Sequence, residues 1–144
     1  MPAADSSLFG DPAAIRCERA VAELRSGRPV VISQRDGQRT AVIALDSATS
    51  RSFDAFARLS GDRHYLFLTE IRTRVLGVEA PQGARLPLAG VAFDALPLLG
   101  YLREPGPMPE HWSAGDALDA GAVELARLGL LLPAMVGVSL GAGD

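Results

Sequence analysis

Apolar residues recur every three or four positions between Pro12 and Ser26, and this spacing predicts an amphipathic helix. Asp11 can cap the start of the helix, and proline suits its first position. Gly27 follows and predicts a helix end in the left-handed conformation. Cys17 belongs to the apolar positions of the pattern, so we expect its side chain to be buried.

Two strands joined by a tight turn follow this helix. Val30–Ser33 combines two valines with an isoleucine, which is typical of a strand covered on both faces. Asp36 and Gly37 form a dipeptide that favours a hairpin turn. Thr40–Leu45 is then the returning strand, antiparallel to the first.

The pattern next alternates between helix and strand. A helix is expected over Arg51–Ser60, because polar residues that can cap it come just before. Tyr65–Leu68 reads as a buried strand. Thr69 is expected to cap a short helix over Glu70–Leu76, which Gly77 ends.

Residues 79–109 have a different character, because six prolines and several glycines interrupt them. We expect loops here, with a short strand near Leu86–Val91 and a short helix near Phe93–Leu102. After them, a polar residue, Ser113 or Asp116, is expected to cap a helix with an apolar stripe that runs through Leu128. Met135–Leu140 reads as a closing strand.

The alternation of helices and strands predicts an α/β (α+β) fold, a single layered domain with a mixed sheet. We expect a leader over residues 1–10, the domain over residues 11–140 and a tail over residues 141–144. The whole chain of 144 residues fits one domain of ordinary size.

Composition narrows the function classes. The chain is 48% apolar and 22% charged, which is globular composition, and its net charge of −3 makes a nucleic-acid partner unlikely. The single cysteine excludes a disulfide within one chain. No stretch reads as a secretory signal or a membrane span, so we expect a cytoplasmic protein with no membrane partner.

Three segments carry a family resemblance: Ala20–Ser33, Leu66–Leu76 with its T-E-x-R sequence, and Val123–Leu140. In this order they resemble 3,4-dihydroxy-2-butanone-4-phosphate (DHBP) synthase, a lyase of riboflavin biosynthesis. The resemblance implies the fold of that family, shortened in the middle, and a homodimer. It also implies conversion of ribulose 5-phosphate to dihydroxybutanone phosphate and formate with Mg²⁺.

The residues that carry this chemistry in the family are replaced here. An acidic loop of the form D-D-E-D-R-E-x-E-G-D follows the first strand in the family, whereas Gln34–Thr40 has one carboxylate and reads as a plain hairpin. Leu118 stands near the place of the metal-binding histidine, and Ser139 near that of a late catalytic glutamate. A lyase without metal ligands and acid–base groups loses the main sources of its rate. We therefore predict no catalytic residues, no cofactor and no synthase activity.

A few residues remain candidates for a site. Arg35, Arg39 and Thr40 flank the hairpin and could form a residual phosphate-binding corner. No metal site is predicted; if a metal binds, Glu110 and His111 are the first candidates, because they are the only adjacent acid–imidazole pair. His64 is expected at the surface or at a strand edge with its hydrogen bonds satisfied.

The sequence therefore favours a catalytically degenerate DHBP-synthase-like domain with a structural or assembly role. Such domains resemble the N-terminal part of some bacterial GTP cyclohydrolase II proteins, so we expect a covalently following cyclohydrolase domain. Two alternatives stay open. Gly27–Leu45 also resembles the strand-hairpin of prevent-host-death antitoxins, which are small DNA-binding modules. A divergent active phosphosugar lyase would need ligands from a partner chain.

Overall fold

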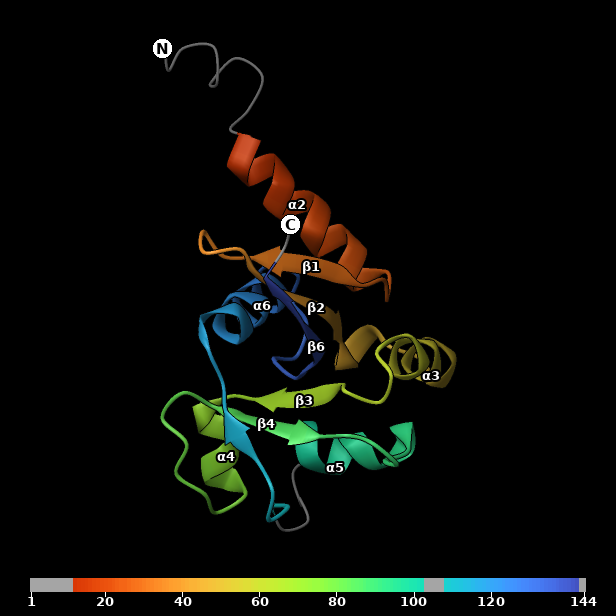
Figure 1. Ribbon diagram of the computed structural model, residues 1–144, viewed down its shortest axis with the longest axis vertical. Helices are drawn as coiled ribbons and strands as arrows, with labels where there is room; N and C mark the ends of the chain where they lie inside the picture. Colours follow the sequence, from red (N-terminus) through yellow and green to blue (C-terminus); the bar gives the residue numbers. More distant parts are fainter. Residues whose placement is uncertain (1–11, 103–107, 143–144) are drawn as a thin grey trace.

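A computed structural model of the protein describes residues 12–102 and 108–142 (Figure 1). The described helices are α2 (Pro12–Arg25), α3 (Ser50–Leu59), α4 (Glu70–Val75), α5 (Leu96–Gly100) and α6 (Ala117–Leu128), with short 3-10 turns η1 (Leu45–Ser47) and η2 (Phe93–Ala95). The strands are β1 (Val30–Ser33), β2 (Gln38–Ala44), β3 (Tyr65–Leu68), β4 (Ala84–Pro87), β5 (Ser113–Ala114) and β6 (Met135–Ala142). None of these helices is long and apolar enough to cross a membrane.

The six strands form one sheet in the order β1-β2-β6-β3-β4-β5. Every strand pair within the described ranges is antiparallel, which corrects the expected mixed sheet. The alternation of helix and strand suggested neighbouring parallel strands. β2 and β3, which α3 connects, do run in the same direction, but β6 lies between them and opposes both.

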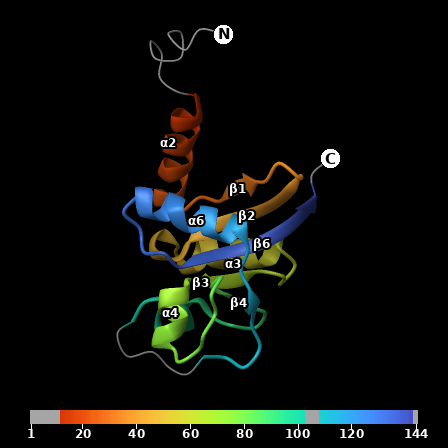
Figure 2. The ribbon, with the colours of Figure 1, turned by 90° about the vertical axis from the view of Figure 1, so that its left-hand side faces the viewer.

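Helices cover both faces of the sheet (Figures 1 and 2). α2 and α6 pack on one face, where the strands present Val42, Ala44, Tyr65, Phe67 and Met135. α3, η2 and α5 lie on the other face, where the strands present Ile43, Leu66, Leu68, Leu86 and Val136. Burial of these two apolar layers is the main source of stability. The predicted α+β layered class is therefore confirmed.

Local signals placed most helix ends correctly. Thr49 caps α3 by accepting from the backbone N–H of Ser52, whose side chain accepts from Thr49 in return. Thr69 caps α4, and Asp116, rather than Ser113, caps α6. Gly27 after α2 has a φ of +79°, as predicted for a left-handed helix end.

The structure corrects several details of the expected elements. Cys17 is exposed on α2 although it lies two turns before the buried Leu24 on the same helix face, because the first part of α2 projects beyond the sheet (Figures 1 and 2). β1 is an edge strand whose residues alternate between half-buried and exposed, so it is not covered on both faces. The strand expected near Leu86–Val91 is β4, which starts two residues earlier. It also ends earlier, because a turn closed by the bond from Val91 N–H to the Leu88 carbonyl follows it.

Other differences arise where tertiary contacts decide. The helix expected over Phe93–Leu102 is divided into η2 and the shorter α5, with Pro97 in its first turn. β5 contains two residues only and was not predicted. The closing strand continues through Ala142. The expected leader over residues 1–10 lies outside the described residues, and the domain boundaries stay a prediction.

Candidate functional site

A cavity of about 370 Å³ opens at the end of the sheet where β3 begins and β6 approaches its end. Residues from the α3–β3 connection and from strands β3, β4, β5 and β6 surround it. They are Asp62, Arg63, His64, Tyr65, Arg85, Pro87, Ser113 and Ser139. The cavity combines hydroxyl, guanidinium and carboxylate groups, which makes it the candidate site of this domain.

Asp119 lies beside this cavity in the first turn of α6 and is only 1% exposed. Its Oδ1 accepts a hydrogen bond of 2.7 Å from the Tyr65 hydroxyl, and its Oδ2 accepts one of 2.7 Å from Arg85 Nε. The same Oδ2 accepts from the backbone N–H of Asp116 at 3.0 Å. These three donors provide the hydrogen bonds that a buried carboxylate requires.

Arg85 on β4 is the only cation bonded to this carboxylate in the described part of the chain. Its Nη2 lies 3.0 Å from an Asp116 carboxylate oxygen, and its guanidinium carbon lies 4.4 Å above the centre of the Tyr65 ring. Burial alone would lower the pKa of Arg85, but the hydrogen bond that it donates to Asp119 and the nearby negative charges raise the pKa overall. The guanidinium therefore stays charged.

Tyr65 on β3 completes this cluster of Tyr65, Arg85 and Asp119, with the exposed Asp116 at its edge; we call these four residues the buried network. Burial, together with the hydrogen-bonded Asp119 carboxylate, raises the pKa of the Tyr65 phenol well above its ordinary value. The ring passes over Gly137 of β6, where an added Cβ would lie 2.8 Å from ring atoms. A glycine at position 137 is thus needed for the ring to reach Asp119.

The buried network is closed on itself. Asp119 uses both oxygens, Arg85 bonds both acidic residues, and the phenol is held protonated. Two carboxylates against one guanidinium leave no surplus positive charge for a phosphate, and Asp62 and Arg63 at the cavity wall offset one another. The arrangement joins α6 to β3 and β4, and both of its carboxylates are occupied by contacts within the chain.

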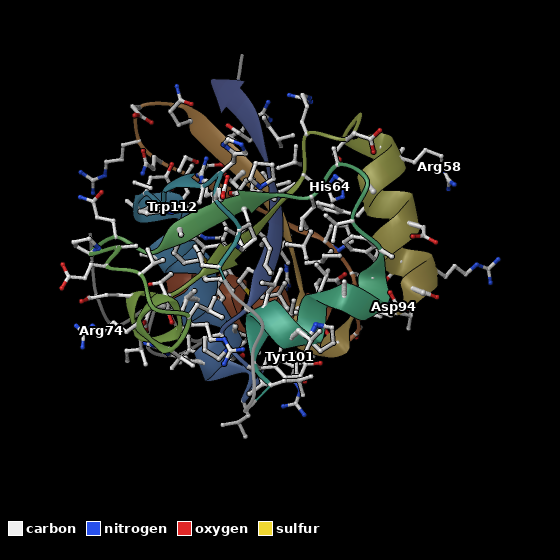
Figure 3. The ribbon with its side chains drawn as sticks, turned by 90° about the horizontal axis from the view of Figure 1, so that it is seen from below. Arg58, His64, Arg74, Asp94, Tyr101 and Trp112 are labelled. Atoms are coloured by element: carbon white, nitrogen blue, oxygen red, sulfur yellow. The ribbon has the colours of Figure 1, made fainter. Side chains whose placement is uncertain are left out.

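His64 differs from the expectation of a surface or edge histidine with satisfied hydrogen bonds. Its side chain is 2% exposed and lies on the side of the sheet that faces α3 (Figure 3). There its ring packs edge-on against the Phe53 ring, with 5.4 Å between the two ring centres. Its Nδ1 has no hydrogen-bond partner in the described residues. Burial lowers the pKa of His64, and the nearby negative charge of Asp62, which acts to raise it, offsets only part of this effect.

The three candidates for phosphate binding do not line the cavity. Arg35 is exposed in the hairpin turn, which the bond from Gly37 N–H to the Gln34 carbonyl closes. Arg39 and Thr40 are adjacent in β2, at an irregularity in its pairing with β6. The Arg39 Nε and the Thr40 hydroxyl are buried without a hydrogen-bond partner among the described residues. A phosphate-binding role for these residues stays a prediction.

The magnesium site that the resemblance implies does not fit the residues present. Leu118 is packed in the core, and Ser139 offers a single hydroxyl. Glu110 and His111 are exposed and adjacent to one another. The described part of the chain contains no group of three or more His, Cys, Asp or Glu side chains that could hold a metal ion. Magnesium needs several oxygen ligands in an octahedral arrangement, which these residues do not supply.

Sequence reasoning missed the buried network. Asp116 was expected only as a possible helix cap, and it does form a reciprocal capping box with Asp119. The three-residue spacing of Asp116 and Asp119 gave no indication that the Asp119 carboxylate also points into the core. Outside the network, Glu70 pairs with Arg74 within α4, whereas Arg72 donates to the carbonyls of Leu98 and Leu99.

Curated proteins resemble this chain in sequence, and solved structures resemble it in fold. No family model matches the chain. It is 56% identical over 132 residues to "GTP cyclohydrolase-2" of Xylella fastidiosa (strain Temecula1), which covers 92% of this chain and 33% of that protein. It is 35% identical over 140 residues to "GTP cyclohydrolase-2" of Azospirillum brasilense, covering 88% of this chain and 35% of that protein. The chain therefore spans about one third of the length of the curated relatives it matches.

Four solved structures similar to this chain are DHBP synthases. A two-domain DHBP synthase from A. baumannii superposes with a TM-score of 0.61 and 18% identity, over 85% of this chain and 47% of that one. A cation-free DHBP synthase superposes with a TM-score of 0.60 and 20% identity, over 85% of this chain and 73% of that one. At this identity the likeness establishes the fold, and it confirms the resemblance seen in the sequence.

Proposed function

We propose that this chain is a catalytically degenerate DHBP-synthase-like domain with a structural and assembly role. It forms the N-terminal part of a cytoplasmic GTP cyclohydrolase II protein in riboflavin biosynthesis. The domain extends over residues 11–140, acts as a homodimer and uses no cofactor. It serves as a scaffold and does not catalyse the lyase reaction.

The buried network is the observation that supports this proposal most directly. A synthase has to hold a hard cation and move protons from sugar carbons, which requires free carboxylates. Here Asp119 and Asp116 are bonded to Arg85 and Tyr65 instead. One solved DHBP synthase of this fold contains two magnesium ions, whereas residues 12–102 and 108–142 of this chain contain no group of three or more His, Cys, Asp or Glu side chains that could hold one.

The relatives supply the second line of support. Both are called GTP cyclohydrolase-2, and this chain matches only about one third of either. A protein with that name needs a cyclohydrolase domain, and the synthase fold found here accounts for a different part of it. We therefore infer that a cyclohydrolase domain follows this one in the same polypeptide.

An assay with ribulose 5-phosphate and Mg²⁺ tests the loss of the lyase reaction. Formate release is measured for the purified protein and, as a positive control, for an active DHBP synthase of the same fold. We expect no formate above the protein-free blank. General acid–base groups alone accelerate such a reaction by about 10²–10⁴-fold, and the proposal is that this domain lacks them. Magnesium-dependent turnover above the blank would show that the site is active.

A further inference from the structure

An apolar groove lies on the α3 side of the sheet, beyond the part that α3 covers. It has a volume of about 260 Å³ and is distinct from the cavity at Tyr65 and Arg85. The sheet supplies its floor, and the end of α3 supplies one wall. The lining residues are Pro29, Val31, Ala41, Phe56, Leu59, Ser60, Arg63, Val138 and Leu140.

The floor of the groove is a continuous apolar surface across three strands. Val31 of β1 is paired with Ala41 of β2, which is paired with Val138 of β6, so the three side chains share one face. Leu140 follows on the same face of β6. On the opposite face α2 and α6 cover these strands, but here the helices reach only the strands nearer the centre of the sheet.

Large apolar side chains at the groove are exposed to solvent. Leu59 is 87% exposed, Val31 is 53% exposed and Leu140 is 39% exposed. β1 pairs with β2 alone, so its outer edge is unpaired within the described residues. An apolar sheet face beside an unpaired edge is a site of association in natural proteins. A partner can bury the apolar surface and pair with the free backbone N–H and C=O groups of the edge.

The path of the chain points to what covers the groove. β6 continues through Ala142, two residues beyond Leu140, and it extends past the end of α3 (Figure 3). The relatives are about three times as long as their match to this chain. A domain that follows β6 is therefore tethered directly beside this groove, at a high effective concentration.

We propose that the groove is the docking surface for the domain that follows β6 in the full-length protein. This inference rests on the proposed function, which supplies that domain. An apolar segment of the following domain fills the floor over Val31 and Leu140, and an acidic side chain faces Arg63 at the rim. An interdomain interface of this kind buries about 600–1,500 Å².

Cysteine labelling of the full-length protein tests the docking. Leu59→Cys places a thiol in the groove, and Leu130→Cys is a matched control, because Leu130 is also 87% exposed. Leu130 precedes β6 and thus lies at the opposite end of that strand from Leu140. N-ethylmaleimide labelling is followed by peptide mass spectrometry, with the exposed native Cys17 as an internal reference.

We expect the thiol at position 59 to react at least about tenfold more slowly than the thiol at position 130, since a docked surface reacts only when it opens. Val31→Cys serves as a second probe and should be slow as well. Cleavage of the polypeptide between the two domains should restore fast labelling at both groove positions.

The other outcomes contradict one proposal or both. Equal rates at positions 59 and 130, in a protein that contains a cyclohydrolase domain, overturn the docking and leave the proposed function standing. Slow labelling that disappears on dilution identifies a second copy as the occupant and also overturns the docking. An intact protein without a second domain overturns both proposals.

Discussion

Asp119 is the residue on which the polar contacts inside this domain converge. It receives the Tyr65 hydroxyl, the Arg85 guanidinium and a backbone N–H, all from within the chain. When a buried carboxylate loses a hydrogen-bond donor, the free-energy cost of removing it from water remains, but the bond that offset this cost is gone. The stability of the domain should therefore respond strongly to single-atom changes around Asp119.

Removal of the Tyr65 hydroxyl is the simplest such change. We expect Tyr65→Phe to lower the free energy of unfolding by about 1.5–3 kcal/mol, because a charge-assisted hydrogen bond to a buried group is lost. Tyr101→Phe is the matched control, since Tyr101 is 37% exposed, and should change stability by less than about 0.5 kcal/mol. Urea unfolding measures both. Equal effects of the two substitutions would contradict the importance of the network.

His64 should make stability depend on pH. Its pKa is lowered in the folded protein, so below about pH 6.5 the unfolded chain binds a proton that the folded chain does not. The contribution of this neutral imidazole is fully present above that pH and is lost as the pH falls through the lowered folded pKa.

The measurement is urea unfolding in the range just below neutral pH. We expect His64→Leu to weaken the fall in stability with decreasing pH, and His111→Leu to leave it unchanged, because His111 is exposed. An identical pH slope in the wild type and the His64 variant would show that the buried imidazole does not titrate in this way.

At the scale of elements, the turn into β4 depends on a glycine. Gly83 has a φ of +74°, and a Cβ at this position would lie 2.5 Å from the backbone carbonyl oxygen of Leu68. Gly90 has a φ of +79°, with no atom within 4 Å of the same added Cβ. The two positions share the strain of a left-handed backbone and differ in the space around them.

This difference gives a matched pair of substitutions. We expect Gly90→Ala to cost about 1–2 kcal/mol, the cost of left-handed backbone alone. Gly83→Ala should cost at least about 3 kcal/mol, since the backbone of β3 must also move. Thermal or urea unfolding compares them. A similar cost at both positions would mean that β3 and the turn separate easily.

How much of each element the sequence predicts depends on how local its cause is. The Asp36–Gly37 hairpin and the caps at Thr49 and Thr69 were predictable, because their hydrogen bonds lie within a few residues. The two-residue β5 and the position of β6 were not, because they depend on pairing between distant segments. The buried network was missed for the same reason: Tyr65 and Asp119 are far apart in the sequence.

At the scale of the whole molecule, the proposed homodimer needs a surface other than the groove. Exposed apolar side chains on α4 and α5 provide candidates, namely Ile71, Val75 and Leu98. An exposed apolar area of this kind is a common feature of association surfaces. We expect a second copy to cover part of it.

Light scattering after size-exclusion chromatography measures the assembly. We expect a mass twice that of one polypeptide, in the presence of a reducing agent, because the exposed Cys17 could otherwise link two copies covalently. Cys17→Ser should have the same mass as the wild type. A single-chain mass over the accessible concentration range would contradict the dimer and weaken the assembly role.

The position of β6 has a consequence for synthesis on the ribosome. Because this strand lies between β2 and β3, the nascent chain holds two separate partial sheets until β6 has emerged. Pairing of β2 with β6 spans most of the sequence, and contacts of this kind form slowly. A message truncated before Met135 would therefore yield two unjoined hairpin units with exposed apolar faces, which chaperones and proteases recognise.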